Sequence, residues 1–181
     1  MNRQGDHRGP RGSSATPSAR GLDIRPVTID DLEVLIDIYL DTARHHAAID
    51  PEVYSVPDRA DIAVRLRRRI DGRGVTGEYI AAMIDGQMVG SASVDIADPP
   101  SAGNMVRAVP TAEFGVSVVD GWRGRGIGRA LIQHLERWAA DHGIERMILN
   151  VSEANEGAIR LYHDMGYRDY DRAMLKRLTR T

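Results

Sequence analysis

Apolar residues in the first third of the chain recur three or four positions apart, which is the spacing of a helix with one buried face. The pattern predicts a short strand over 22–26, followed by an amphipathic helix over 29–47. A second helix is predicted to begin at Asp58 or Asp61, and the glycine-containing stretch 71–74 ends it. Two helices therefore precede the main body of strands.

The middle of the chain changes to the two-residue period of β-strands. Residues 78–84 and 87–95 are predicted to form a hairpin, because an Asp-Gly pair separates the two apolar runs. A further strand is predicted over 110–119. Its alternation places Phe114, Val116 and Val118 on one face, and Glu113, Gly115 and Ser117 on the other.

The last third of the chain returns to helical spacing before its final strands. We expect a helix over 124–142, a strand over 145–152 and a short helix over 155–164. A last pair of strands is expected over 167–170 and 173–178. This mixture of strands and helices predicts an α/β fold.

Composition separates the first residues from the rest. Residues 1–21 are rich in Arg, Gly, Ser and Pro, which predicts a disordered basic tail before a single domain over 22–181. The net charge of −2 predicts no nucleic-acid partner for the chain as a whole. The absence of cysteine excludes disulfides and a thiol nucleophile. No apolar run suits a membrane span or a secretory signal, so we expect a cytoplasmic protein that does not bind membranes.

The stretch that carries candidate chemistry joins the strand over 110–119 to the next helix. It reads Arg-Gly-Arg-Gly-Ile-Gly over residues 123–128. Glycines let the main chain approach a ligand closely, and a helix start presents unpaired N–H groups and partial positive charge. With the added arginine charges, the stretch is suited to bind a diphosphate.

Three ligands with a diphosphate were compared. A dinucleotide loop of the short-chain dehydrogenase type needs Gly-x-x-x-Gly-x-Gly, but Trp122 stands four residues before Gly126. That motif also belongs near the start of a chain, and no tyrosine here has a lysine four residues on. A nucleotide P-loop needs Gly-Lys-Ser/Thr, which the chain lacks. Coenzyme A is the third ligand.

Two elements resemble the GCN5-related N-acetyltransferases. Residues 123–128 match the family motif Gln/Arg-x-x-Gly-x-Gly/Ala, and residues 155–162, Asn-Glu-Gly-Ala-Ile-Arg-Leu-Tyr, match Asn-x-x-Ala-x-x-Leu-Tyr ahead of Gly-Tyr at 166–167. The resemblance extends over about 22–178. It implies a mixed, mostly antiparallel sheet that splays in the middle, with helices on both faces and acetyl-CoA as co-substrate. By that resemblance the cofactor contacts are Val116, Val118, Arg123, Gly124, Arg125, Gly126, Gly128 and Asn155.

The resemblance also suggests catalytic roles. Tyr162 is the candidate general acid for the leaving thiolate, or else a tyrosine that packs the short helix. Glu113 is the candidate base for the amine, directly or through water, or else a solvated charge at a strand end. The implied reaction is direct attack of an amine, without a covalent enzyme intermediate. The alternative is a non-catalytic acyl-CoA sensor or partner subunit.

The first two helices are expected to form one wall of the acceptor site. His46 and Tyr54 are the candidate substrate contacts there, although His45 and His46 also suit an exposed helix end. Arg65, Arg67, Arg68 and Arg69 either attract an acidic acceptor or form a solvated helix face. We expect no metal, a small-molecule or peptide amine as the acceptor, and a monomer or homodimer.

Overall fold

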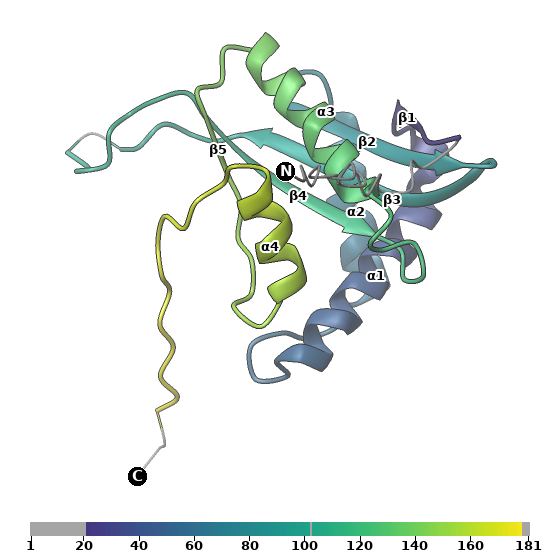
Figure 1. Cartoon of the computed structure of the whole chain (residues 1–181), viewed down its shortest axis with the longest axis horizontal. Coiled ribbons are helices and arrows are strands. Elements are labelled where there is room, and N and C mark those ends of the chain that lie inside the picture. Colours follow the sequence, from purple (N-terminus) through teal and green to yellow (C-terminus); the bar gives the residue numbers. More distant parts are fainter. Residues whose placement is uncertain (1–20, 102, 179–181) are drawn as a thin grey trace, which may run out of the picture.

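The computed structural model describes residues 21–101 and 103–178. Figure 1 shows a central sheet with helices on both sides. In chain order the elements are β1 (Asp23–Pro26), a 3-10 turn η1 (Ile29–Asp31), α1 (Leu32–Ile49), α2 (Arg59–Asp71), β2 (Gly77–Ile84), β3 (Gln87–Ile96), β4 (Thr111–Val118), α3 (Ile127–Asp141), β5 (Arg146–Ile148) and α4 (Glu156–Asp164).

The strands lie in the order β1-β2-β3-β4-β5. The first four pair antiparallel, and β5 pairs parallel to β4. Asp85 and Gly86 both have positive φ at the turn between β2 and β3, as a two-residue type I′ hairpin requires. The predicted α/β class, with a mixed and mostly antiparallel sheet, is confirmed.

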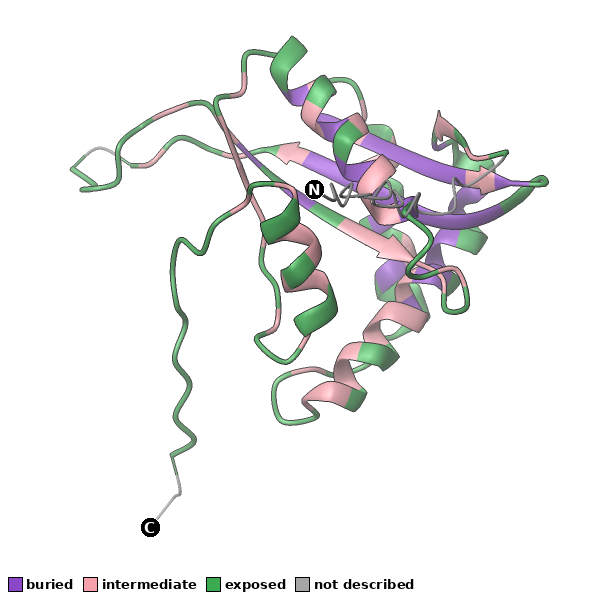
Figure 2. Ribbon diagram, in the orientation of Figure 1, coloured by how far each residue is buried: buried purple, intermediate pink, exposed green. Residues whose placement is uncertain are grey.

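The sheet separates two apolar cores. The face that carries Ile80, Val94 and Phe114 packs against α3, whose Leu131 and Leu135 are fully buried. The opposite face packs against α1 and α2. As a result, β2 and β3 are buried over most of their length, whereas α4 has no buried residue (Figure 2). Helices on both faces are thus confirmed.

The start of the first helix is fixed to β1 by an ion pair. Arg25 on β1 donates from both guanidinium nitrogens to the two oxygens of Asp31, at 2.8 and 2.7 Å. The same carboxylate accepts the Thr28 main-chain N–H at 2.8 Å. The hydrogen bond from Arg25 has the largest effect on the pKa of Asp31 and lowers it, and the Thr28 N–H lowers it further. Burial has the opposite effect but is outweighed. The predicted helix over 29–47 is confirmed, with η1 as its first turn.

The sheet opens between its last two strands. The β4–β5 ladder runs only from Thr111 opposite Arg146 to Glu113 opposite Ile148. Beyond Glu113, β4 continues to Val118 beside β3, whereas the chain after Ile148 leaves the sheet. The expected splay therefore begins directly after Glu113.

Two predicted boundaries were wrong, and one predicted pair of strands does not form. The helix predicted from 124 begins at Ile127, because positive φ at Gly124 and Gly126 holds these residues in a loop. The strand predicted over 145–152 is paired only over Arg146–Ile148. Residues 167–170 and 173–178 form no strand, because this segment pairs with no strand of the described chain and is exposed apart from Tyr167, which packs against Phe114 (Figure 1).

Two further expectations concern the N-terminal tail and membrane-spanning helices. The predicted basic tail over 1–21 lies outside the described residues, apart from Gly21. Among the helices within 21–101 and 103–178, none is both long and apolar enough to cross a lipid bilayer.

Candidate active site

A cavity of about 730 Å³ lies where the sheet opens. Its walls come from α1 and α2 on one side, and from the loop before α3 together with α4 on the other. The floor is formed by β3 and β4. The cavity therefore joins the predicted diphosphate loop to the predicted acceptor wall.

The main chain of β4 turns polar groups toward this opening. Thr111 and Val119 both hydrogen-bond to the β3 side, through Ala97 N–H and Val89 C=O. Because strand residues alternate in direction, the even-numbered residues of β4 point their N–H and C=O groups away from β3. Val116 and Val118 are such residues, they line the cavity, and β5 no longer pairs beside them.

The loop before α3 presents an open helix start. Gly126 is the N-cap with φ +82°, and no side chain caps the helix. The first helical hydrogen bond is donated by Ala130 N–H to the carbonyl of Gly126, so the N–H groups of residues 127–129 have no partner within the helix. A side-chain carbon placed on Gly124 or Gly126 would meet no atom within 4 Å. The loop thus offers free space beside unpaired donors and no acidic residue in the first turn.

The arginines of the loop point in different directions. Arg123 donates through Nε to the carbonyl of Val118 at 3.1 Å, and its terminal nitrogens lie 3.6 Å from Asp41 and 3.5 Å from His45 Nδ1. It lines the cavity and connects the loop to α1. Arg125 instead stacks over the Trp122 ring at 4.8 Å and is not among the residues that line the cavity.

Helix α4 supplies the opposite wall near the opening. Asn155 is its N-cap and accepts the Ala158 N–H at 3.2 Å, so its side-chain carbonyl has a structural role. Gly128 and Tyr162 line the same region. Tyr162 packs edge-on against Phe114, with ring centroids 6.1 Å apart, and burial raises the pKa of its phenol. The phenol is therefore protonated at neutral pH and able to donate a proton.

The predicted base lies beside the cavity, not in its wall. Glu113 is exposed at the last β4–β5 pair and accepts a hydrogen bond from Asn150 Nδ2 at 3.0 Å. Asn150 itself lines the cavity. A proton that reaches Glu113 from the cavity must therefore travel past Asn150 or through water.

His46 and Tyr54 are brought together, but only His46 lines the cavity. Their ring centroids lie 5.1 Å apart, so Tyr54 packs behind the imidazole. Burial, then the neighbouring charges of His45 and Arg123, lower the pKa of His46. His46 is therefore neutral near pH 7.

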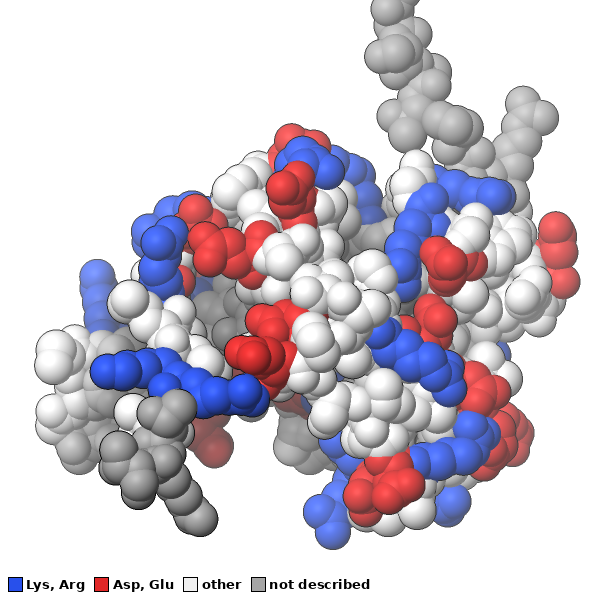
Figure 3. All heavy atoms as spheres, turned by 90° about the horizontal axis from the view of Figure 1, so that it is seen from below, with Lys and Arg blue, Asp and Glu red and all other residues white. Residues whose placement is uncertain are grey.

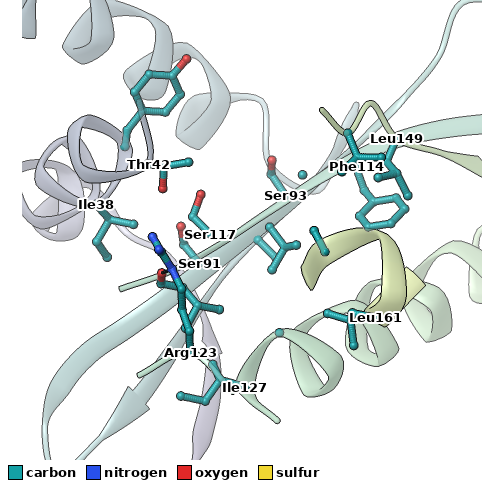
Figure 4. Close-up of a pocket in the computed structure, with 18 of the residues that line it drawn as sticks. Ile38, Thr42, Ser91, Ser93, Phe114, Ser117, Arg123, Ile127, Leu149 and Leu161 are labelled. Atoms are coloured by element: carbon teal, nitrogen blue, oxygen red, sulfur yellow. Dashed lines mark hydrogen bonds between the residues drawn. The ribbon is translucent and has the colours of Figure 1, made fainter. Parts of the chain in front are cut away.

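Several polar residues of the cavity were missed by sequence reasoning. Figure 4 shows Ser91, Ser93 and Ser117 on the strands, with Thr42 facing them from α1. For Ser117, the alternation that places it with Gly115 on one face of β4 was the signal that could have identified it. Among the described residues, no group of His, Asp and Glu is arranged to hold a metal ion.

Comparison with known proteins gives a family match over most of the chain. A sequence profile described as "Acetyltransferase (GNAT) family" matches residues 35–167. N-acetyltransferase 8 of Rattus norvegicus is 30% identical over 123 residues, which is 67% of this chain but 51% of that protein. L-amino acid N-acetyltransferase AaaT of Escherichia coli K12 is 30% identical over 125 residues, covering 65% of this chain and 70% of that protein.

A solved structure supports the same fold. Aminoglycoside N-acetyltransferase AAC(6')-Iy, determined in complex with CoA, superposes with a TM-score of 0.65 at 20% identity. The match covers 94% of this chain and 99% of that one.

Proposed function

Because the chain belongs to the acetyltransferase (GNAT) family, we propose that it transfers an acetyl group from acetyl-CoA to a primary amine of a small molecule or peptide. The observation that carries this proposal is the single cavity shared by the glycine loop, the open edge of β4 and Tyr162. Named relatives are N-acetyltransferases, and a structural neighbour was solved with CoA.

The residues present fit acetyl-CoA in three ways. The unpaired N–H groups at the start of α3 suit its diphosphate, with Gly124 and Gly126 leaving room for close approach, whereas Gly128 lets α3 pack against Leu161 and Val118. Arg129 lines the cavity beside them, and its guanidinium is 3.8 Å from Asp164. The outward-facing main-chain groups of Val116 and Val118 suit the amides of the pantetheine arm, although the Val118 carbonyl already accepts from Arg123. Acetyl-CoA supplies a thioester carbonyl that a neutral amine can attack.

The protein's own groups then manage two protons. The new C–N bond forms as the C–S bond breaks, which leaves a thiolate and an extra proton on nitrogen. Tyr162 donates its phenolic proton to the thiolate, since burial keeps the phenol protonated. Glu113 accepts the amine proton through water beside Asn150. His46 belongs to the acceptor wall, where its neutral imidazole orients the amine, and Tyr54 supports the ring from behind.

Thermal stabilisation tests the cofactor assignment. Acetyl-CoA, CoA and NADPH are each added to the wild type and to Gly126→Glu, and melting temperatures are compared. A ligand at about 100 times its Kd stabilises by about 2.7 kcal/mol, or roughly 5–10 °C for a chain of this size. A rise in melting temperature with acetyl-CoA and with CoA that disappears in Gly126→Glu supports the proposal.

Other outcomes have definite meanings. No shift with either coenzyme contradicts the proposal, and a shift with NADPH alone favours a dinucleotide enzyme. A shift with acetyl-CoA, but no thiol release with any amine, favours an acyl-CoA sensor over an enzyme.

A further inference from the structure

Four arginines and no acidic residue stand among the described residues that line the cavity. The basic side chains of the lining are His45, His46, Arg65, Arg69, Arg123 and Arg129, and none of the described residues that line it is Asp or Glu. The outer surface differs, because acidic and basic side chains are interspersed over the face seen in Figure 3. The positive character is therefore a property of the cavity and not of that face.

Three of the four arginines have an acidic neighbour outside the cavity lining. These pairs are Arg69 with Asp95, Arg123 with Asp41, and Arg129 with Asp164. For Arg65, no carboxylate lies within 4 Å in the described part of the chain. Within residues 21–101 and 103–178, Arg65 is thus the one arginine of the lining without a carboxylate partner.

Arg65 is nevertheless held in a defined place. Its Nη1 donates to the Tyr39 hydroxyl at 3.0 Å, and its guanidinium carbon lies 4.9 Å from the centre of the Tyr39 ring. It is exposed and also lines the cavity, so it lies at the solvent edge of the acceptor wall. A guanidinium fixed by one hydrogen bond keeps further donors for a planar anion.

Hydroxyl groups continue the polar surface inward from Arg65. Ser91 and Ser93 on β3 are each 6% exposed and share the sheet face of Ser117. Tyr79 lies on the same side, and although burial raises the pKa of its phenol, the charges of Arg69 and Arg65 oppose that shift. Polar groups therefore extend from Arg65 over the sheet face that lines this side of the cavity.

We propose that the acceptor is an amine that also carries a carboxylate, with the carboxylate held by Arg65 and the nitrogen directed toward Tyr162. This inference rests on the proposed acetyl transfer. A carboxylate completes the missing charge pair at Arg65, whereas a polycationic amine meets only like charge in the lining. The hydroxyls of Ser91, Ser93 and Ser117 line the same cavity and supply further hydrogen-bond donors to such a molecule.

Matched amines test the proposal by thiol release from acetyl-CoA. The panel contains L-amino acids and longer ω-amino carboxylates, each beside its own carboxamide, together with spermidine. For pairs that react, we expect kcat/KM to be about tenfold or more higher for the carboxylate, the size of a charge-assisted contact. Arg65→Gln removes this preference.

Arg67→Gln is the matched control, because Arg67 is exposed on the same helix and does not line the cavity. It should keep the wild-type preference, and all three proteins should be stabilised equally by acetyl-CoA. A preference for carboxamides or spermidine overturns the proposal, as does a carboxylate preference that survives in Arg65→Gln.

Failure of the underlying acetyl transfer gives a different result. If neither acetyl-CoA nor CoA stabilises the protein, both proposals fall. If coenzymes bind but no amine reacts, the CoA-bound protein is melted with each carboxylate and its carboxamide. Equal stabilisation by the two members of every pair then overturns the carboxylate proposal.

Discussion

The left-handed backbone at Gly126 should be required for the stability of the loop, and Gly126→Ala measures this directly. The residue has φ +82°, and a methyl group there would touch no atom within 4 Å. Any cost therefore comes from the backbone and not from a clash. An L-residue in this region costs about 1–2 kcal/mol, and the lower entropy of unfolded alanine returns roughly 0.4–1 kcal/mol. We expect a net loss of about 1 kcal/mol.

Gly157→Ala provides the matched control. Gly157 lines the same cavity and also has no atom within 4 Å of an added carbon, but it lies in the first turn of α4 without positive φ. Alanine there should be neutral or stabilising by up to about 1 kcal/mol. Ligand-free melts are compared, and 1 kcal/mol corresponds to about 2–4 °C.

The two variants together separate the possible causes. A Gly126→Ala protein that melts at the wild-type temperature or above would refute the backbone argument. Equal losses in both variants would point to the filling of the cavity as the cause. A loss confined to Gly126→Ala supports a conformational requirement at the N-cap of α3.

Three further predictions concern catalysis, pH and the core. Tyr162→Phe should lower kcat about 100-fold with little change in KM, because it removes the proposed general acid; an unchanged kcat in the thiol-release assay excludes the role. Asp31 has a folded pKa below its ordinary 3.8, so its stabilisation is present above that value and is lost as pH falls through the folded pKa. Melts of Asp31→Asn should accordingly depend less on acid pH than those of wild type or of Asp37→Asn, in which only an exposed carboxylate is removed. Leu131→Ala should lower the free energy of unfolding in urea by about 2–5 kcal/mol, since Leu131 is fully buried, and a loss below about 1 kcal/mol would contradict that placement.

Local patterns predicted the elements whose causes are local. The Asp85-Gly86 turn fixed the hairpin because few residue pairs adopt two successive positive φ values. The alternation in β4 predicted which side chains share a face, and the structure shows that the face with Phe114 packs against α3. The glycines of residues 123–128 predicted an open helix start, although the pattern alone placed that start three residues early.

Features that depend on distant partners were less predictable. Residues 167–178 carry a strand-like pattern, but a strand forms only where a neighbour offers hydrogen bonds, and no strand of the described chain pairs with them. The length of β5 likewise depends on where β4 diverges from it. In the site, helical spacing grouped the arginines of α2 without showing that Arg65 and Arg69 turn inward while Arg67 does not.

The two walls of the cavity come from separate stretches of the chain. Residues 32–71 provide the acceptor wall, whereas residues 111–164 provide the open strand, the glycine loop and Tyr162. The first stretch is anchored to the sheet mainly by its own apolar core with residues such as Tyr79 and Ala81. The contacts of Arg123 with Asp41 and His45 tie the two walls together, so a change in the first stretch must keep these two residues if the loop is to stay in place. A chimera with α1 and α2 from another member of the family, in which Asp41, His45 and the sheet-facing side chains are kept, should therefore change the acceptor preference under the proposed function and leave the glycine loop intact.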